Sequence, residues 1–267
     1  MKFHKYSGAG NTFLITDGRR NEESLPTSEE VSRLCRKAGV DGLMALLESE
    51  DADFRMVYYN SDGSSGMMCG NGGRCIAAFA DCLGIRPANG RAYVFEAPDG
   101  LHEAQILSRE GDLATVRLSM RDPEGFEKLV CEGFEGCFVN TGTRHFVTFV
   151  EDVENVDVAA TGASLRRSPV FAPEGVNVNF VSSDRDGMLH IRTFEKGVEA
   201  ETLACGTGIT AAAIVSWLSG IAPTGREGER VRYVLSARIA ELAVEFTAFP
   251  DGRITAVTLE GPAQRLI

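Results

Sequence analysis

Two cysteines stand out because each begins the same short pattern. Cys69 is followed by Gly-Asn-Gly and a run of small apolar residues, and Cys205 is followed by Gly-Thr-Gly and a similar run. A thiol at the start of a helix is acidified by the helix dipole and by nearby backbone N–H groups. Two such thiols on opposite faces of one carbon would form a two-base system that moves a proton between faces.

The spacing of the two patterns suggests an internal duplication. They are separated by about half of the 267-residue chain, so we expect two similar halves that each present one cysteine. A single Cys-Gly-x-Gly sequence is a weak signal, because free cysteine is often a small core residue, but its repetition favours a catalytic pair. The other cysteines lack this context and are interpreted as packing or surface residues: Cys35, Cys82, Cys131 and Cys137.

The chemistry that this pair suits is proton abstraction next to a carboxylate. Most enzymes that do this form an imine with pyridoxal phosphate. A cofactor-free enzyme needs a base near the carbon, a proton donor on the opposite face and many N–H groups around the carboxylate. Two cysteines at glycine-rich helix starts offer that set, because glycine lets the backbone approach an anion closely.

Composition narrows the class of protein. Hydrophobic residues make up 43% of the chain, enough for a packed core, and the net charge of −11 argues against nucleic acid or an anionic membrane as the main partner. No apolar run approaches the length of a membrane span, and the first residues lack the apolar core of a signal peptide. The seven cysteines favour reduced thiols in a cytoplasmic protein, and their spacing does not match a zinc site, so no metal is expected.

Periodicity predicts strands separated by turns, with few helices. A helix is predicted over 28–38, where Thr27 and Glu30 form a capping box, and further helices over 70–84 and 206–219. The last is apolar nearly all round and must be buried on every side. Strands are predicted at Asn11–Asp17, Phe54–Tyr59, Ala114–Ser119, His145–Val150, Asn177–Val181, Val231–Leu235, Leu242–Phe246 and Ile254–Leu259.

The two cysteine patterns, together with the residues before them, resemble the active-site motifs of the diaminopimelate epimerases. The first motif runs from Asn60 to Cys75, and the second from Glu195 to Gly208. Shorter matches follow in the family's order along essentially the whole chain, at Gly8–Asn11, Gly39–Gly42, Gly142–His145, Asn177–Phe180 and Gly261–Ala263.

The resemblance implies an α/β fold of two pseudo-symmetric halves, each a mainly antiparallel strand barrel round a central helix, that close on the substrate. The N-terminal half is expected to span 1–119 and to be completed by a C-terminal strand at about 252–267, and the C-terminal half to span 120–251. The resemblance implies neither pyridoxal phosphate nor metal. Its partners would be a small amino-acid substrate and a second copy in a homodimer, with no nucleic acid or membrane.

Carried over by position, the resemblance also implies roles for individual residues. Cys69 and Cys205 would be the catalytic thiols, His145 would tune the protonation of one of them, and Glu195 would bind an ammonium group. The remaining positions would bind substrate: Gly70, Asn71, Gly206 and Thr207 the carboxylate at the reacting carbon, and Asn11, Asn60, Asn177 and Lys196 the amine or the distal carboxylate. From the residues alone, Asn60 is also a turn former, His145 a core histidine and Glu195 a solvated charge.

Three departures from the family pattern bear on specificity. Thr143 and Arg144 stand where the family commonly has Asn-Pro or a small residue and Pro, Lys196 stands where it usually has arginine, and the segment 197–201 is one residue longer. Lysine does not clamp a carboxylate bidentately, and Arg144 is expected to supply a replacement cation.

The predicted function is therefore the interconversion of LL- and meso-diaminopimelate for lysine and peptidoglycan synthesis. The alternatives are a cofactor-independent racemase of the proline or hydroxyproline type, or one of relaxed specificity. A non-racemising isomerase or a binding protein of the same fold is the alternative from a different class. Which thiol deprotonates which stereoisomer stays open at this point.

Overall fold

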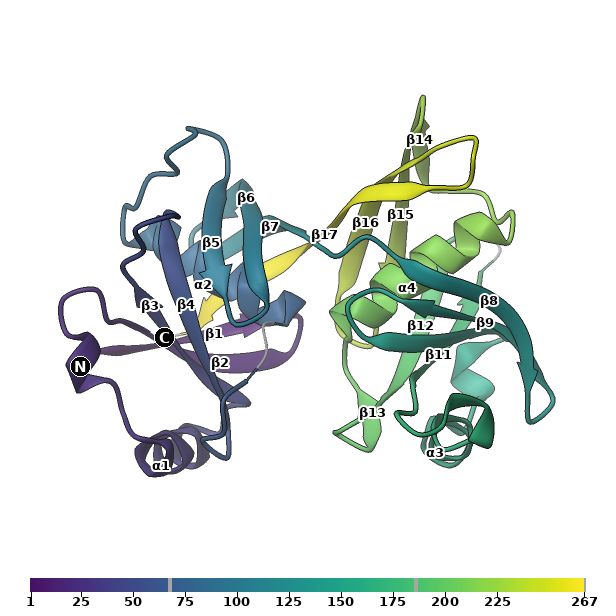
Figure 1. Ribbon diagram of the computed structural model, residues 1–267, viewed down its shortest axis with the longest axis horizontal. Coiled ribbons are helices and arrows are strands. Elements are labelled where there is room, and N and C mark those ends of the chain that lie inside the picture. Colours follow the sequence, from purple (N-terminus) through teal and green to yellow (C-terminus); the bar gives the residue numbers. More distant parts are fainter. Residues whose placement is uncertain (67–68, 185–186, 267) are drawn as a thin grey trace. The chain divides into compact units, whose positions relative to one another are not determined.

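The computed structural model describes residues 1–66, 69–184 and 187–266 of the chain. These residues form two compact units: unit 1 comprises Met1–Ser119 and the C-terminal residues from Glu260, and unit 2 comprises Met120–Leu259. In each unit, strands surround one central helix (Figure 1). No helix in the described ranges is long and apolar enough to cross a membrane.

Unit 1 is a closed barrel. Its strands are β1 (Phe3–Gly8), β2 (Asn11–Asp17), β3 (Gly42–Leu47), β4 (Phe54–Asn60), β5 (Tyr93–Ala97), β6 (Gly100–Glu110), β7 (Leu113–Ser119) and the later part of β17 (Ile254–Leu266). Each strand from β1 to β7 pairs with the next, and β17 pairs with both β7 and β1, which closes the ring. The pairs β2–β3 and β4–β5 are parallel.

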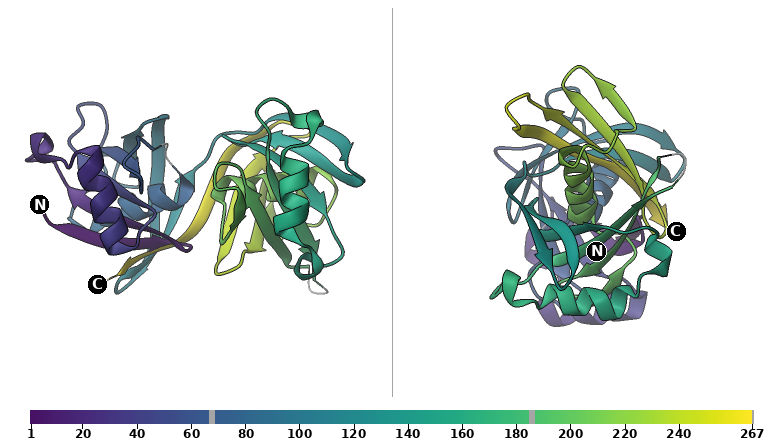
Figure 2. Two further views of the ribbon diagram at one scale, coloured as in Figure 1. Left: turned by 90° about the horizontal axis from the view of Figure 1, so that it is seen from below. Right: turned by 90° about the vertical axis from the view of Figure 1, so that its right-hand side faces the viewer.

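Helix α2 (Gly70–Cys82) fills the centre of this barrel, and every residue of Gly70–Ala80 is buried. Helix α1 (Ser28–Ala38) lies outside, on β3 and β4 (Figures 1 and 2). It begins at the predicted capping box and ends at Gly39, whose φ of 59° is the left-handed conformation that glycine adopts readily. A short 3-10 helix, η1 (Glu22–Ser24), precedes α1. The predictions of helices at 28–38 and 70–84 are confirmed.

Unit 2 repeats this plan. Its strands are β8 (Glu124–Cys131), β9 (Phe134–Asn140), β10 (Arg144–Phe149), β11 (Asn177–Ser183), β12 (Leu189–Glu195), β13 (Ala200–Thr202), β14 (Gly225–Glu227), β15 (Arg230–Ser236), β16 (Glu241–Ala248) and the first part of β17. The main order is β8–β9–β10–β11–β12–β15–β16–β17, and β13 and β14 pair at the side with β12 and β15.

Helix α4 (Gly206–Leu218) lies within the strands of unit 2, as the right-hand view of Figure 2 shows. Helix α3 (Val158–Arg166) lies outside on β11 and β12, between the 3-10 helices η2 (Val153–Asn155) and η3 (Pro169–Phe171). The two parallel pairs of unit 2, β10–β11 and β12–β15, fall at the same places in the order as those of unit 1. The predicted α/β fold of two pseudo-symmetric halves is therefore observed.

Strand β17 contributes to both units, so the division between the units falls within the C-terminal strand that the sequence analysis places at about 252–267. The first part of β17 belongs to unit 2, where Met120 N donates to Val257 O and Thr258 Oγ1 donates to Glu245 O. Only from Glu260 does the strand belong to unit 1, where Gln264 to Leu266 pair with β1. The boundary lies within one continuous strand, so no turn or linker in the sequence marks it.

Candidate active site

Cys69 is the N-cap of α2 in unit 1. Its backbone is extended, with φ −116° and ψ 149°, and its Sγ accepts a hydrogen bond from the Gly72 N–H at 3.3 Å. The sulfur therefore lies at the start of a buried helix, where the N–H groups of the first turn point outward and the helix dipole favours negative charge. This is the environment that stabilises a thiolate.

A run of polar side chains adjoins Cys69. Asn71, only 4% exposed, donates from Nδ2 to Asn11 Oδ1 at 2.6 Å, and its Oδ1 accepts from Arg74 Nη2 at 2.8 Å. Arg74 is fully buried, and burial lowers the pKa of its guanidinium to about 10, so the group stays charged near neutral pH. It also donates to Pro262 O on β17. The predicted residues Asn11 and Asn71 are thus brought together at the start of α2.

Asn60 has a different local role. It ends β4, and its Nδ2 donates to Ser64 Oγ at 3.0 Å and to Ser65 O at 3.5 Å. Its backbone N–H donates to Ser64 O, so both ends of the residue fasten the turn that follows the strand. These contacts agree with the interpretation of Asn60 as a turn former.

Cys205 occupies the equivalent position in unit 2, as the N-cap of α4. It is 8% exposed, and its Sγ lies 3.5 Å from Thr207 Oγ1. Thr207 is held at two points, because its carbonyl accepts from Thr141 Oγ1 at 2.9 Å and its hydroxyl lies 3.0 Å from Thr143 Oγ1. This thiol therefore contacts a hydroxyl, whereas the Cys69 thiol contacts a backbone N–H.

His145 is connected to Cys205 by hydrogen bonds through two threonines. The two are linked through Thr207 and Thr143, with His145 Nε2 2.8 Å from Thr143 Oγ1. Its Nδ1 lies 3.1 Å from Asn179 Nδ2, and Asn179 Oδ1 accepts from Thr193 Oγ1 at 2.9 Å. Burial lowers the pKa of His145 to about 3, so the ring is neutral at physiological pH.

The polar residues around each cysteine are called its half-site. In the Cys205 half-site, the remaining predicted residues are Asn177 at the start of β11 and Glu195 and Lys196 at the end of β12. Asn177 Oδ1 accepts from the Lys196 N–H at 2.8 Å, and its Nδ2 donates to Arg144 O at 3.2 Å and to Thr143 Oγ1 at 3.3 Å. Glu195 ends β12, and burial raises the pKa of its carboxyl, an effect that the nearby Thr202 opposes.

The Arg144 side chain points to partners within unit 2. Its guanidinium pairs with Glu174 and lies 5.2 Å from the centre of the Phe138 ring. Only its backbone carbonyl, which accepts from Asn177, joins the polar residues near Cys205. The side chain is committed to an ion pair and a cation–π contact, and this pairing depends on tertiary structure that the local sequence does not reveal.

The glycines three residues after each cysteine pack closely, and the packing is tighter at Gly208 than at Gly72. A Cβ on Gly208 would lie 2.4 Å from Asn179 Oδ1 and 3.4 Å from Cys205 Sγ. A Cβ on the equivalent Gly72 would lie 3.3 Å from both Cys69 Sγ and Met44 Sδ. Each helix start therefore packs against one side chain of a surrounding strand, which we call its floor. The floor is the Asn179 amide in unit 2 and the Met44 thioether in unit 1.

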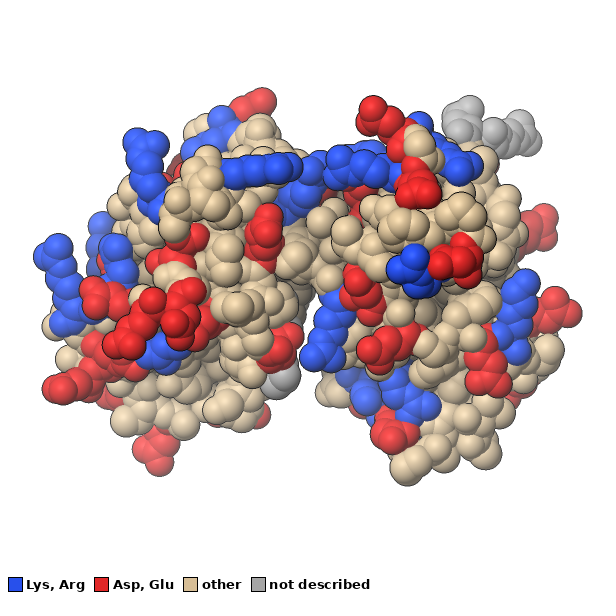
Figure 3. Space-filling view, turned by 45° about the horizontal axis from the view of Figure 1, so that its top comes forward, with Lys and Arg blue, Asp and Glu red and all other residues tan. Residues whose placement is uncertain are grey.

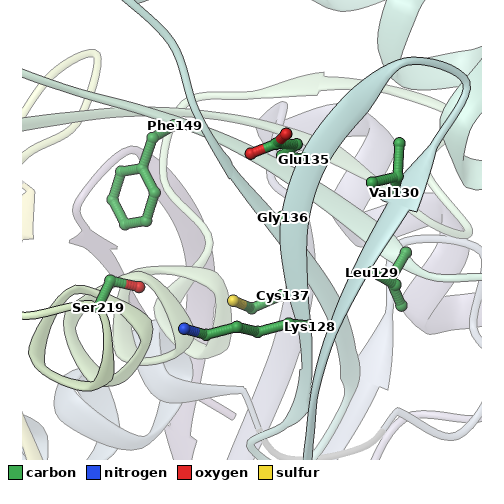
Figure 4. A pocket seen from close by; sticks show the side chains of 8 residues that line it. All are labelled: Lys128, Leu129, Val130, Glu135, Gly136, Cys137, Phe149 and Ser219. Atoms are coloured by element: carbon green, nitrogen blue, oxygen red, sulfur yellow. The ribbon is translucent and has the colours of Figure 1, made fainter.

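A separate cavity of about 330 Å³ in unit 2 contains another cysteine, Cys137 (Figure 4). Burial raises the pKa of the Cys137 thiol, against the opposing effects of Lys128 and Ser219. Ser219 caps the C-terminal end of α4, the end opposite Cys205. The raised pKa agrees with the interpretation of Cys137 as a packing residue, and the described residues include no group of His, Cys, Asp or Glu that could hold a metal ion.

Sequence reasoning missed three residues that the structure brings to the half-sites: Arg74, Asn179 and Thr193. Arg74 is the one charged residue of α2 before Asp81, in a helix otherwise suited to a barrel interior. Asn179 lies two residues after Asn177 on a buried strand, so both side chains are on the same face. These polar residues at buried positions were the available signals.

Surface charge is mixed in both units. Figure 3 shows Lys and Arg side chains close to Asp and Glu side chains on the surface of each unit. Several form ion pairs, including Arg55 with Glu22 in unit 1 and Arg238 with Glu154 in unit 2. Exposed pairs of this kind add little stability but neutralise local charge.

Comparison with known families gives a consistent match. The family model described as diaminopimelate epimerase matches residues 3–122 and 137–243. The chain is 45% identical over 218 residues to the diaminopimelate epimerase of Chlorobaculum tepidum, covering 80% of this chain and 82% of that protein. It is 38% identical over 267 residues to the diaminopimelate epimerase of Flavobacterium psychrophilum, covering 99% and 97%.

Solved structures share the fold at low sequence identity. A PhzF-family phenazine biosynthesis protein of Bacillus anthracis is similar with a TM-score of 0.76 and 16% identity, covering 100% of this chain and 98% of that one. A probable proline racemase of Agrobacterium radiobacter K84 has a TM-score of 0.63 and 18% identity, covering 99% and 90%. These likenesses establish the fold alone, whereas the sequence relatives establish the family.

Proposed function

Because the chain belongs to the diaminopimelate epimerase family, a family of isomerases, we propose that it interconverts LL- and meso-2,6-diaminopimelate. The product would serve lysine and peptidoglycan precursor synthesis. The observation that carries the proposal is the pair of cysteines, each the N-cap of a central barrel helix in a duplicated fold. Neither cysteine is in a disulfide bond in the structure.

In the proposed reaction one cysteine is a thiolate and the other a thiol. The thiolate takes the proton from the α-carbon and becomes a thiol, while the other thiol gives its proton to the opposite face and becomes a thiolate. The carbanion-like intermediate keeps its negative charge on the adjacent carboxylate, which backbone N–H groups at a helix start stabilise. The two thiols exchange roles between the forward and reverse reactions, because both directions pass through the same intermediate.

The other site residues have binding roles in this proposal. The helix starts at Gly70 and Gly206, with Asn71 and Thr207, hold the carboxylate at the reacting carbon. Asn11, Asn60 and Asn177 bind the amine or the distal carboxylate. Glu195 is partly buried and binds an ammonium group, and Lys196, the residue that follows it, provides the cation for the distal carboxylate.

The substrate assignment rests on the sequence relatives. Solved structures named as proline racemase and hydroxyproline epimerase share less than 25% identity with the chain, so they do not favour a cyclic amino acid. Lys196 supports some turnover of shorter dicarboxylic amino acids, because a lysine grips a distal carboxylate less selectively than an arginine fork. We place the reaction in the cytoplasm and expect a homodimer.

Proton–deuterium exchange tests the proposal directly. We expect the purified protein, without pyridoxal phosphate, to convert LL-diaminopimelate to the meso isomer in D₂O with deuterium at the α-carbon of the product. Proline, hydroxyproline, glutamate and aspartate form the comparison panel, and a Cys69→Ala/Cys205→Ala double variant is the blank. Faster exchange of proline than of diaminopimelate would transfer the proposal to the racemase alternative, and no exchange of any substrate would remove it.

A further inference from the structure

An unbroken run of polar side chains connects the interior of unit 2 to the Cys205 sulfur. It passes from Asn179 to His145, Thr143 and Thr207, with heavy-atom separations of 3.1, 2.8 and 3.0 Å, and then 3.5 Å to Sγ. A hydroxyl can point its hydrogen either way along such a run. The backbone groups at its margins, however, determine the direction of the hydrogen bonds as far as Thr143.

The first fixed point is at Asn179. One side-chain atom of Asn179 lies 3.2 Å from the Phe146 carbonyl, which only accepts hydrogen bonds, so this atom is the amide nitrogen Nδ2. The same Nδ2 faces His145 Nδ1, so Nδ1 must accept. The neutral imidazole therefore carries its proton on Nε2, and Nε2 donates to Thr143 Oγ1.

The second fixed point is at Asn177. Its Oδ1 faces the Lys196 backbone N–H at 2.8 Å, which only donates, so its Nδ2 is the atom that faces Thr143 Oγ1. Thr143 Oγ1 thus accepts from both His145 and Asn177. With both lone pairs occupied, its own hydrogen points to Thr207 Oγ1, which leaves the Thr207 hydrogen available to a Cys205 thiolate 3.5 Å away.

We propose that Thr143 and Thr207 form an oriented hydroxyl chain that presents a fixed O–H donor to the Cys205 thiolate, with neutral His145 as its anchor and not as the base. Thr207 contacts the reacting sulfur, and Thr143 is a positioning residue that acts through it. The proposal deepens the proposed function and rests on Cys205 being one of its thiols.

The geometry excludes His145 as the acceptor of the thiol proton. Its Nε2 already carries a proton, and its Nδ1 is occupied by the Asn179 amide. Protonation at Nδ1 would put two donors against each other in a fully buried site, in agreement with the pKa lowered by burial. The contribution of His145 to the thiol is the direction of the hydrogen bonds, which a neutral ring transmits without moving a proton.

The test measures thiol reactivity without substrate, which separates it from the epimerase assay. Each full-length protein is treated with iodoacetamide at neutral pH, and alkylation of the Cys205 peptide is followed by mass spectrometry. We expect Thr143→Val, which keeps the shape and removes the hydroxyl, to slow Cys205 alkylation about tenfold, the change that follows a rise of about one unit in thiol pKa. Thr143→Ser should stay within about twofold of wild type.

Cys69 in the same samples is the internal control, and its alkylation rate should not change. An unaltered Cys205 rate in Thr143→Val, or Thr143→Ser as slow as Thr143→Val, would overturn the proposal. If the alkylation rates follow this pattern but the wild-type protein does not epimerise diaminopimelate, the hydroxyl chain is supported and the proposed function is overturned.

A second measurement uses the wild-type protein and does not depend on a variant folding. In ¹⁵N-histidine NMR spectra, we expect His145 to show a protonated Nε2 and an unprotonated Nδ1 from about pH 5 to pH 8. The chain has four histidines, so the His145 signals are assigned by their loss in His145→Gln. A protonated Nδ1, or titration to the imidazolium within this range, would contradict the assigned direction.

Discussion

Cys69 and Cys205 hold the same position in two units with the same order of elements, but the residues beneath them differ in kind. The floor under Gly72 is Met44, and the floor under Gly208 is Asn179. In unit 1 the buried Phe13 follows Asn11 by two residues, whereas in unit 2 the buried His145 follows Thr143 by two residues.

The polar contacts of the two half-sites also differ in the charge at their inner end. In unit 1 the run from Asn11 through Asn71 ends at the guanidinium of Arg74, a permanent cation. In unit 2 the run from Cys205 ends at a neutral imidazole and an amide. The two units therefore place a cysteine at the same point of the same backbone plan, but a buried guanidinium lies near Cys69 and threonine hydroxyls lie near Cys205.

Removing either thiol gives the largest effect that this comparison predicts. We expect Cys69→Ala and Cys205→Ala each to lower kcat/KM for epimerisation by more than about 10³-fold, because each face of the carbon needs its own proton carrier. Both directions of the reaction should be measured, LL to meso and meso to LL, with circular dichroism to check the fold. Different supports for the two thiolates do not make either thiol dispensable.

The exposed Cys82 provides the matched control, and Cys82→Ala should retain wild-type activity. Substantial epimerisation by either active-site variant would show that one thiol serves both faces. In that case the duplication would have a structural role only, and the comparison of the two half-sites would lose its functional meaning.

The two helix-start glycines test the difference between the floors. We expect Gly208→Ala to lower the free energy of unfolding by about 2–3 kcal/mol, because its Cβ would meet the Asn179 amide oxygen, which Thr193 and the rest of the network hold in place. Gly72→Ala should change it by less than about 1 kcal/mol, since Met44 is a flexible neighbour and alanine is the better helix former.

Urea unfolding measures both effects. The single tryptophan, Trp217, is in α4 and reports on unit 2 by fluorescence, while far-UV circular dichroism reports on both units. Equal losses of unfolding free energy in the two glycine variants would mean that Asn179 moves aside as easily as Met44. The inference that hydrogen bonds hold Asn179 rigidly in unit 2 would then be wrong.

Several elements of the fold could be predicted from the sequence because the patterns that indicate them are local. The capping box at Thr27, the repeated cysteine patterns and the apolar helix at 206–219 all depend on residues close together in the sequence. Strand β3 was not predicted, because both of its faces are buried, between α2 and α1, and its sequence shows no alternation. Helix α3 was missed for a related reason: Gly162 interrupts its pattern, and that glycine exists to admit the Phe194 ring.

The contacts of Asn179 with His145 and Thr193 beneath Cys205 could not be predicted from the sequence for a different reason. They join β10, β11 and β12, whose register and spacing arise only from the folded barrel. A histidine or a threonine in a strand is usually a packing residue, and no local pattern distinguishes one whose hydrogen bonds reach a thiol. The family resemblance placed His145 beside a thiol, and the structure adds that two hydroxyls lie between them.

The smallest predicted effect concerns acid stability and the contrast of Phe13 with His145. Burial lowers the pKa of His145 to about 3 from the ordinary value of 6.5. Below pH 6.5 the unfolded chain therefore binds a proton at this residue and the folded protein does not. Stability falls as the pH drops from 6.5 toward 3, by about 2 kcal/mol at pH 5 from this residue alone.

Replacing the titrating ring should remove that slope. The free energy of unfolding is measured by Trp217 fluorescence in urea for wild type, His145→Gln and His145→Phe, the last of which introduces the residue type of Phe13. We expect it to fall more steeply between pH 7 and pH 5 in wild type than in either variant. Both variants will be less stable at pH 7, so the quantity compared is the slope. The other histidines and the carboxylates are common to all three proteins, and their contributions cancel. Parallel slopes would show that His145 is protonated in the folded state, and the neutral anchor under Cys205 would be lost with it.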